Sequence, residues 1–456
     1  MINSCYQRES AKQPVGIYKE HFMKRIAVVG AGASGMSAAI AAARAGAHVT
    51  LFERNPRVGK KLSQTGNGRC NFGNRNLSGQ AYYSQSPAFI EAFIKRFDTA
   101  DTIRFFESLG LVIQERDGLL YPYSAQASTV VEVLTQELVK LGVELHTGSF
   151  IRRVDRITIN HPRFCITVYS DGQEQLYYFD RLILACGGLA APKTGSDGSG
   201  YTLCETLGHP TTPTHPALVP LLCTDAYCKE LAGVRAHARV HILEEDRELA
   251  QEEGELQFTK EGLSGIPIFQ ISRIISERLL QTNGKTKLTA SVNFFPELPP
   301  QEMRQWIDRR VEALGERDVP TFFQGFLHQK VTNLLCQLSQ KAPKSHADDA
   351  KSRIQLSSNR NHMIQSATVE HGHYVQYMKI AQALPFHIRA TASFEQAQVT
   401  AGGIPLQDIT EEFESRIHSG LFLVGELLDA DGICGGYNLH WAWGSGQIAG
   451  NAAAGK

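Results

Sequence analysis

Residues 25–53 decide the fold, and they read RIAVVGAGASGMSAAIAAARAGAHVTLFE. The run 25–29 is apolar and rich in β-branched residues, which predicts a buried parallel strand. A glycine-rich turn follows, and an alanine-rich helix over 34–45 ends at Gly46. Residues 48–52 predict a second strand. The segment is therefore a β-α-β unit of about 30 residues, typical of a Rossmann-like α/β domain.

The turn at residues 30–35 carries a glycine fingerprint. Gly30 permits the tight turn, Gly32 lets a pyrophosphate approach the backbone, and Gly35 lets helix and strand pack closely. The N-terminus of the helix would face the phosphates. Glu53 ends the second strand, where a carboxylate can accept the ribose hydroxyls. The pattern predicts a bound dinucleotide, and the alternative is a glycine-rich turn with a surface glutamate.

A second motif, GKKLSQTGNGRCN at residues 59–71, distinguishes FAD from NAD. A plain dehydrogenase would continue from its second strand into a simple helix. Here a long loop of glycine, asparagine and cationic residues lies where FAD proteins place the pyrophosphate and the flavin edge. Glycines permit close backbone approach, and Lys and Arg offset phosphate charge. A surface loop with solvated lysines is the alternative.

Cys70 lies in this loop and is the candidate catalytic residue. Near the flavin ring, its thiol could protonate a reduced double bond. The alternative is a small, packed thiol without a chemical role.

The C-terminal region supplies a third motif. A strand at 421–424 leads into Gly425, Glu426 and Asp429, and a helix follows at about 439–453. In two-dinucleotide flavoproteins such a unit meets the ribityl chain and the pyrophosphate through its acidic residue. The helix N-terminus then points at the flavin pyrimidine and stabilises the anionic reduced ring. Because this strand and helix return to the first sheet, the middle of the chain is predicted to be an insertion.

The pattern between the motifs predicts further parts. Residues 87–110 and 124–142 show helical spacing, and alternating segments over 150–180 predict an antiparallel meander. Prolines cluster from residue 210, short alternating strands follow, residues 301–365 look helical, and short strands then return. The predicted domains are a disordered tail or misassigned start at 1–22, a discontinuous FAD-binding domain at 23–208 and 385–456, an inserted β-rich substrate domain at 209–298 and 366–384, and a helical lobe at 299–365.

Composition argues against several functional classes. The 46 basic and 46 acidic residues give a formal net charge of zero, which disfavours a nucleic-acid binder held mainly by charge. Nine scattered cysteines without a Cys-x-x-Cys pair predict a reduced, cytoplasmic protein. No apolar run reaches roughly 18 residues, and the histidines lack metal-ligand spacing, so neither a membrane span nor a metal site is predicted. A second glycine fingerprint is absent, so NAD(P)H is expected to dock transiently.

The three motifs together resemble the YhiN-like flavoprotein family, also called NAD(P)/FAD-dependent oxidoreductases or the aminoacetone oxidase family, over nearly all of residues 24–453. The stretches that carry the resemblance are TGNGRCN at 65–71, ACGG at 185–188, PKTGSDG at 192–198, FT at 258–259, GLSG at 262–265, VTAGG at 399–403, GE at 425–426 and GGYN at 435–438. The resemblance implies an α/β fold with a Rossmann-like, glutathione-reductase-type FAD domain (parallel sheet plus β-meander), an inserted β-rich domain and a helical lobe. The active site is expected between them.

The resemblance also implies FAD contacts at the matching positions. The full predicted set of cofactor-binding residues is Gly30, Gly32, Ala33, Ser34, Gly35, Glu53, Arg54, Lys61, Gly66, Asn67, Gly68, Arg69, Cys70, Asn71, Ile151, Ala185, Gly187, Gly425, Glu426, Asp429, Gly436, Tyr437, Asn438 and Leu439.

Three functions stay open at this level. Related proteins are associated with reducing enone-type substrates and with making dihydrouridine in ribosomal RNA, so the leading hypothesis is an FAD enzyme that reduces an activated C=C bond with NAD(P)H. The second is an amine oxidase that uses oxygen. The third is a flavin-containing RNA-associated protein. Its RNA-facing surface would be formed by cations of the helical lobe, for which a solvated face is the alternative: Arg304, Arg309, Arg310, Lys330, Lys341, Lys344, Lys351, Arg353 and Arg360.

Overall fold

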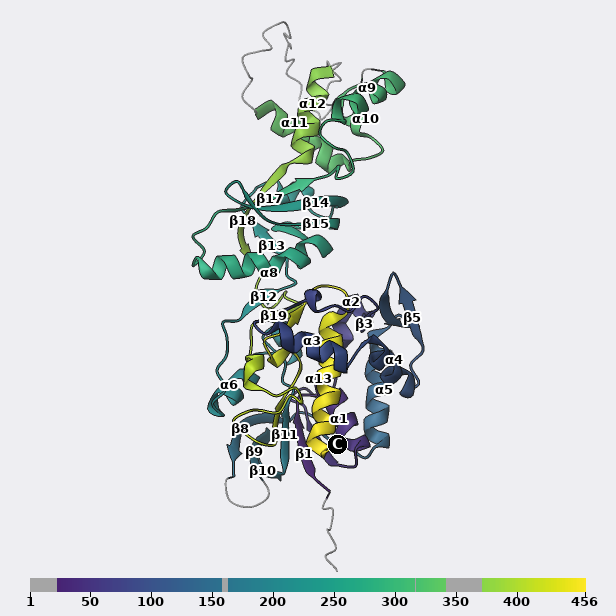
Figure 1. Ribbon diagram of the computed structural model, residues 1–456. Helices are drawn as coiled ribbons and strands as arrows, with labels where there is room; N and C mark the ends of the chain where they lie inside the picture. The colour runs from purple at the N-terminus through teal and green to yellow at the C-terminus, as the bar shows by residue number, and fades with distance from the viewer. Residues whose placement is uncertain (1–22, 158–162, 316, 342–370) are drawn as a thin grey trace, which may run out of the picture.

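The structure, a computed structural model, describes residues 23–157, 163–315, 317–341 and 371–456. Figure 1 shows an elongated molecule whose lower part contains the two ends of the described chain and whose upper part contains its middle. The predicted tail at 1–22 lies outside the described residues.

A five-stranded parallel sheet forms the centre of the lower part, in the order β20-β11-β1-β2-β7. Its strands are β1 (Arg25–Val29), β2 (His48–Phe52), β7 (Glu144–His146), β11 (Arg181–Leu184) and β20 (Leu421–Leu423). Val29 pairs with both Phe52 and Leu184, so the three central strands end at one level. The predicted β-α-β unit and the return of the C-terminal strand to the first sheet are confirmed.

Two helices, α1 (Ala33–Arg44) and α13 (Tyr437–Ala454), pack side by side and run in the same direction. An ideal Cβ on Gly446 would lie 2.4 Å from the Ser34 carbonyl oxygen, and one on Gly450 would lie 2.3 Å from another α1 carbonyl. Only glycine allows this approach. Gly446 is therefore level with Ser34, at the start of α1. Because nine residues of α13 precede Gly446, the α13 N-terminus extends about 13 Å beyond the α1 N-terminus.

The remaining elements of the lower part flank the sheet and these helices. The predicted meander is present, with β9 paired antiparallel to both β8 and β10. Asp98 and Asp101 form a capping box that starts a second helix within the region 87–110. The elements are α2 (Thr65–Gly68), β3 (Gly73–Asn74), β4 (Tyr82–Tyr83), α3 (Pro87–Arg96), α4 (Thr99–Ser108), β5 (Ile113–Arg116), β6 (Leu119–Pro122), α5 (Ala127–Lys140), β8 (Phe150–Arg156), β9 (Phe164–Ser170), β10 (Gln173–Phe179), α6 (Ser199–Thr206) and β21 (Asp431–Gly432).

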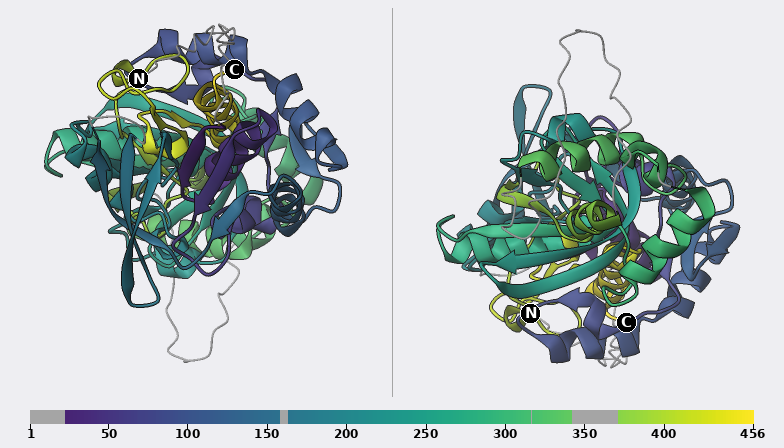
Figure 2. Two further views of the ribbon diagram at one scale, coloured as in Figure 1. Left: turned by 90° about the horizontal axis from the view of Figure 1, so that it is seen from below. Right: turned by 90° about the horizontal axis from the view of Figure 1, so that it is seen from above.

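The upper part is a closed barrel with its own hydrophobic core, in the strand order β13-β16-β15-β14-β17-β18. Figure 2, seen from above, shows the helices of the lobe in green over the barrel strands in teal. The elements are β13 (Leu221–Cys223), α7 (Cys228–Leu231), β14 (Arg235–Glu244), β15 (Arg247–Phe258), β16 (Gly262–Gly265), α8 (Ile266–Gln281), β17 (Leu288–Asn293) and β18 (Leu384–Thr391).

The helical lobe differs from the prediction at its C-terminal end. Its helices are α9 (Met303–Leu314), α10 (Val319–Phe323), α11 (Gln329–Lys341) and α12 (His371–Gln382). Strands were predicted where α12 lies, but Tyr374, Met378 and Ala381 recur at helical spacing and are buried. β18 pairs with β17 and β13, so residues 385–391 belong to the barrel and not to the FAD-binding part. The other domain limits stay predictions, and Lys344, Lys351, Arg353 and Arg360 lie outside the described residues.

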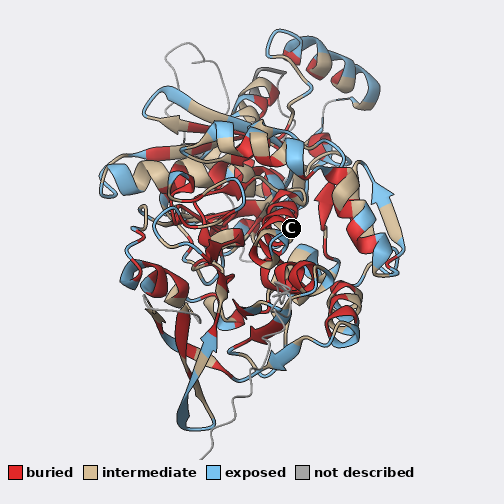
Figure 3. Cartoon of the chain, turned by 60° about the horizontal axis from the view of Figure 1, so that its bottom comes forward, coloured by how far each residue is buried: buried red, intermediate tan, exposed pale blue. Residues whose placement is uncertain are grey.

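A two-stranded ribbon connects the parts. It pairs β12 (His215–Ala217) with β19 (Val399–Ala401), and Ser276 of α8 donates a hydrogen bond of 2.7 Å to the Pro216 carbonyl. Figure 3 shows buried ribbon, in red, through the interior of the molecule and exposed ribbon at its periphery. Because Ser276 of α8 bonds to the ribbon, α8 lies where the barrel meets the sheet-containing part.

Candidate functional site

The glycine turn after β1 is packed at two glycines and open at the third. An ideal Cβ on Gly30, where φ is +102°, would lie 2.4 Å from the Ala185 carbonyl oxygen, and one on Gly35 would lie 1.8 Å from the Gly30 carbonyl oxygen. At Gly32 the same atom would meet nothing within 4 Å. The backbone there borders open space at the α1 N-terminus, which Ala33 begins. This arrangement fits a pyrophosphate bound by the free N–H groups of the first helical turn.

Glu53 is held in a fixed orientation at the end of β2. It is 8% exposed, and its Oε2 accepts a hydrogen bond of 2.9 Å from the Ala31 N–H. Its Oε1 accepts from the backbone and side-chain nitrogens of Asn55, at 2.8 and 2.7 Å. Oε2 keeps a lone pair for a further donor such as a ribose hydroxyl, whereas Oε1 already accepts two hydrogen bonds.

The second motif is a loop of left-handed backbone. Gly66, Asn67 and Gly68 have φ values of 57°, 54° and 80° in succession, which glycine and asparagine tolerate best. The backbone is therefore turned sharply at this point, and the neighbouring Arg69 is exposed.

Ion pairs connect the motifs to one another. Lys61 Nζ lies 2.6 Å from Oε2 of Glu426, and Oε1 of Glu426 accepts from the Thr400 N–H at 2.9 Å. Arg54 pairs with Asp197 at 2.5 Å. The second motif, the VTAGG stretch and the third motif therefore meet at one carboxylate.

Cys70 and Asn71 lie deeper. Cys70 has no exposed surface, and burial raises the pKa of its thiol to about 12. This geometry favours the packed-thiol interpretation. With its amide oriented to satisfy its neighbours, Asn71 donates to the Gly73 carbonyl at 2.9 Å and accepts from the Gly436 N–H at 3.3 Å. Asn71 thereby joins the second motif to the start of α13.

The third motif packs directly on the first. At Gly425, where φ is +71°, an ideal Cβ would lie 2.5 Å from Oγ of Ser34 in α1. The Gly425 N–H donates to Ser445 Oγ, and its carbonyl accepts from the indole N–H of Trp441, both at 3.0 Å. These contacts place the turn after β20 beside the α1 N-terminus.

The start of α13 is fixed by its own side chains. Gly436 precedes the helix with φ of +90°. The Asn438 amide donates to the Gly432 carbonyl at 2.7 Å and accepts from the Gly432 N–H at 2.8 Å. Tyr437 donates through its hydroxyl to the Asn76 carbonyl at 3.1 Å, and Leu439 is half-buried. The groups left for a ligand are the backbone N–H groups of the first helical turn.

Three predicted contacts lie outside the motifs. Ile151 is buried in β8, and Ala185 is buried against Gly30. Gly187 has φ of +73°, and an ideal Cβ there would lie 2.8 Å from Ser196 Oγ. The structure brings Ala185 and Gly187 to the edge of the sheet at which β1 ends.

Two buried acids, Asp429 and Asp431, belong to the segment between β20 and α13. Asp429 is 4% exposed, and burial raises its pKa. Asp431 is 2% exposed, and burial raises its pKa to about 7 although Arg273 lowers it. Nε of Arg273 donates to both oxygens of Asp431, at 2.9 and 3.1 Å.

The sequence matches the HI0933-like protein Rossmann domain over residues 24–452. The chain belongs to the HI0933-like family. This match confirms the family to which the motifs pointed.

The HI0933-like chain has curated relatives of similar length. It is 38% identical over 438 residues to a 3-dehydro-bile acid delta(4,6)-reductase of Clostridium scindens, covering 95% of this chain and 99% of the relative. It is 28% identical over 423 residues to a ribosomal RNA dihydrouridine synthase of Haemophilus influenzae, covering 92% and 95%. A 3-ketosteroid-delta4-(5alpha)-dehydrogenase of Rhodococcus jostii has a similar fold, with a TM-score of 0.51, 14% identity and coverage of 98% and 99%.

The HI0933-like chain is an FAD-dependent oxidoreductase with a Rossmann-type fold. The three motifs fit this cofactor, because the open space at Gly32 and the two staggered helix N-termini suit an elongated dinucleotide. No described helix is long and apolar enough to cross a membrane, and the described residues contain no cluster of three potential metal ligands.

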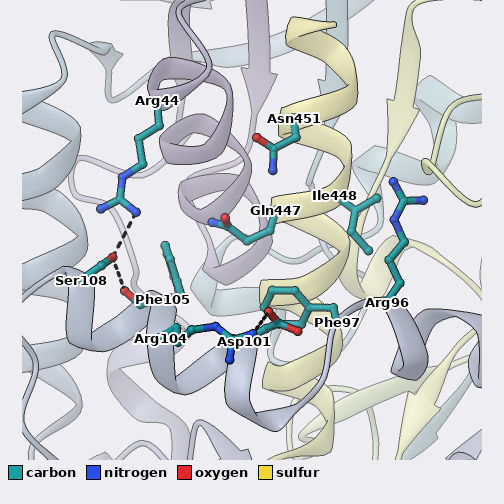
Figure 4. A pocket seen from close by; sticks show the side chains of 10 residues that line it. All are labelled: Arg44, Arg96, Phe97, Asp101, Arg104, Phe105, Ser108, Gln447, Ile448 and Asn451. Atoms are coloured by element: carbon teal, nitrogen blue, oxygen red, sulfur yellow. Dashed lines mark hydrogen bonds and ion pairs between the residues drawn. The ribbon is translucent and has the colours of Figure 1, made fainter. Parts of the chain in front are cut away.

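A pocket of about 460 Å³ lies elsewhere on the HI0933-like chain (Figure 4). It is lined by Arg44 and Ser108 near the C-terminal end of α1 and by Gln447 and Asn451 of α13. Arg44 ends a helix of 12 residues, so the pocket is about 16 Å from the glycine turn. Its arginines are already ion-paired, as Arg44 is with Glu137 at 2.7 Å.

Sequence reasoning missed several residues of the site. Asn55 follows Glu53 in a loop where asparagine is common, and Arg273 lies on an ordinary amphipathic helix, so no signal distinguished them. Asp431 could have been found, because it lies between Asp429 and the glycines that precede α13.

Proposed function

We propose that this enzyme reduces a C=C bond conjugated to a carbonyl group in a small cyclic molecule, with NAD(P)H as the electron donor. The similarity to the bile acid delta(4,6)-reductase carries this proposal, since it covers 95% of this chain. The fold shared with a ketosteroid enzyme agrees with it but adds no evidence about the substrate.

The chain's contribution to this reaction is positioning and electrostatics. When bound, FAD supplies the two-electron chemistry. The α1 N-terminus and the open backbone at Gly32 would bind the pyrophosphate, and Lys61 and Glu426 would hold the segment between the two helix N-termini. The α13 N-terminus, which begins after Gly436, would supply a partial positive charge to stabilise the negative charge of the reduced flavin.

The proposal gives NAD(P)H and the substrate a shared site. A single glycine fingerprint is present in the sequence, and FAD would bind at this first motif. NAD(P)H would therefore dock transiently at the site of the unsaturated substrate, and it would leave before the substrate binds. Cys70 is not used, because its thiol is buried and has a raised pKa. The cytoplasmic location stays a prediction.

Two cations of the helical lobe argue against RNA as the substrate. Arg310 donates to the Phe322 and Gln324 carbonyls at 2.7 and 2.9 Å, so it fixes the lobe internally. Lys330 donates to the Ala232 carbonyl at 2.8 Å. With these two engaged in the fold and a net charge of zero, a small-molecule substrate is favoured over an RNA.

An acceptor panel tests the proposal. The holoenzyme is reduced anaerobically with NADPH or NADH, and excess donor is removed. A cyclic enone, the same ring system without the double bond, an uridine-containing ribosomal RNA fragment, and oxygen are then added in separate experiments. We expect flavin absorbance to return fastest with the enone and not with the saturated analogue.

Each other outcome has a definite meaning. Faster reoxidation by the RNA would assign dihydrouridine synthesis. Failure of both nicotinamides to reduce the flavin, combined with reduction by an amine and peroxide formation, would assign amine oxidation. Either result would overturn the proposal.

A further inference from the structure

One face of α8 contacts the segment that leads into α13. Gln270, Arg273 and Glu277 recur at helical spacing on this face, opposite the residues that pack on the barrel. Figure 1 shows α8 along the side of the barrel that faces β12 and β19. The polar face is thus directed away from the barrel core, towards the FAD-binding part.

Two side chains of this face bind the segment 431–434. Arg273 donates to both carboxylate oxygens of Asp431, and the Gln270 side-chain oxygen accepts from the Cys434 N–H at 2.7 Å. The guanidinium also lies 4.4 Å from the ring centroid of Tyr83, which pairs with Asp431 in the neighbouring strand. The segment is therefore attached to the barrel at both of its ends.

The same segment is attached rigidly to the start of α13. Gly432, next to Asp431, exchanges two hydrogen bonds with the Asn438 side chain in the first turn of the helix. An ideal Cβ on Gly432 would lie 2.7 Å from Cβ of Tyr437, so Gly432 is in close contact with the first residue of α13. A displacement of Asp431 therefore moves the α13 N-terminus.

We propose that Arg273 is a positioning residue through which the barrel holds the N-terminus of α13 against bound FAD, so that the barrel sets the affinity and the redox potential of the flavin.

The buried position of Asp431 makes this contact decisive. A carboxylate that is 2% exposed is stable as an anion only when it is paired, and Arg273 is the cation that pairs with it. Burial, Asp429 and Glu277 all raise the pKa of Asp431, and Arg273 opposes them. Without the guanidinium, the pKa of Asp431 would rise further, and the buried carboxyl group would be protonated and lose its attachment to α8.

The test compares two arginines of the same helix. Arg273→Gln removes the cross-domain pair, and Arg278→Gln is the matched control, because Arg278 pairs with Glu244 at 2.8 Å within the barrel. For the Arg273→Gln holoenzyme we expect the Kd for FAD to rise at least tenfold. We also expect a more negative flavin midpoint potential, because the retreating helix N-terminus stabilises the reduced ring less. Arg278→Gln should leave both quantities unchanged.

Two further variants keep the test decisive. Arg273→Lys retains the charge but not the forked geometry, and should restore part of the FAD affinity. If Arg273→Gln does not fold, Gln270→Ala, which removes only the bond to Cys434, should shift both quantities in the same direction. Equal FAD affinities and potentials in Arg273→Gln and Arg278→Gln would refute the proposal, as would an unchanged Gln270→Ala enzyme. These readouts need no substrate, so they are independent of the proposed reaction.

Discussion

Substituting the glycines of the first motif separates their cofactor role from their packing role. In Gly32→Ala the new methyl meets nothing within 4 Å, and the backbone, with φ of −84° and ψ of −166°, suits alanine. The free energy of unfolding of the apoprotein should therefore change by less than about 1 kcal/mol, since such substitutions chiefly alter the entropy of the unfolded chain. The methyl occupies the space assigned to the pyrophosphate, so FAD affinity should fall at least tenfold, or about 1.4 kcal/mol.

In Gly35→Ala, unlike Gly32→Ala, the main expected effect is a loss of apoprotein stability. Its methyl would lie 1.8 Å from the Gly30 carbonyl oxygen, so helix and strand must separate. Overpacking of this kind costs about 1–3 kcal/mol of stability, and the apoprotein itself should be destabilised. Gly46→Ala is the control, because its φ of +87° is strained for alanine while its surroundings are open. It should lose about 1 kcal/mol of stability and bind FAD normally.

Urea denaturation of the apoproteins and FAD titration by fluorescence quenching measure both effects. A Gly32→Ala protein with wild-type FAD affinity would show that the pyrophosphate does not lie there. A Gly35→Ala apoprotein as stable as the wild type would refute the packing explanation.

Three further predictions concern single side chains. His440 is fully buried with its Nδ1 and Nε2 bonded to Thr102 and Phe97, and burial lowers its pKa from 6.5 to about 4. The unfolded chain therefore takes up the proton first, and about 3 kcal/mol of stability, fully present above pH 6.5, should be lost as the pH falls to 4. Denaturant titrations at several pH values measure this loss, and His440→Gln should remove it. Cys70→Ala should keep kcat within about twofold of wild type in a steady-state enone assay, because the Cys70 thiol is buried with a pKa of about 12. A hundredfold loss of kcat would show that this thiol is the proton donor after all. Lys61→Met should weaken FAD binding at least threefold, because Glu426 loses the ammonium group that lies 2.6 Å from its carboxylate. The FAD titration used for Gly32→Ala measures this, and an unchanged Kd would exclude the Lys61–Glu426 pair from the cofactor site.

The parts of the fold that local sequence encodes were predictable. The strand, glycine turn and helix at 25–45 have periodicities and turn residues that leave one interpretation, and Glu53 follows at a fixed distance. The parallel return of β20 could be predicted because a strand followed by glycines and a helix completes the same type of unit.

The contacts between distant segments could not be predicted in the same way. Arg273 and Asp431 are 158 positions apart, and they meet only because the barrel closes and sets α8 against the ribbon. Similarly, β18 belongs to the barrel because its edges pair with β17 and β13, whereas its alternating pattern suits any half-buried strand. Tertiary pairing, which a single sequence does not display, decided both cases.

Single-turnover reoxidation of the reduced flavin tests the proposal that this enzyme reduces a conjugated C=C bond. The holoenzyme is reduced anaerobically with dithionite, mixed with a cyclic dienone in a stopped-flow instrument, and followed by flavin absorbance, while the product is analysed by mass spectrometry. We expect rapid return of oxidised flavin and a product that has gained two hydrogen atoms across the conjugated double bond. Flavin that stays reduced in the presence of dienones, yet is oxidised by oxygen with release of peroxide, would contradict the proposal.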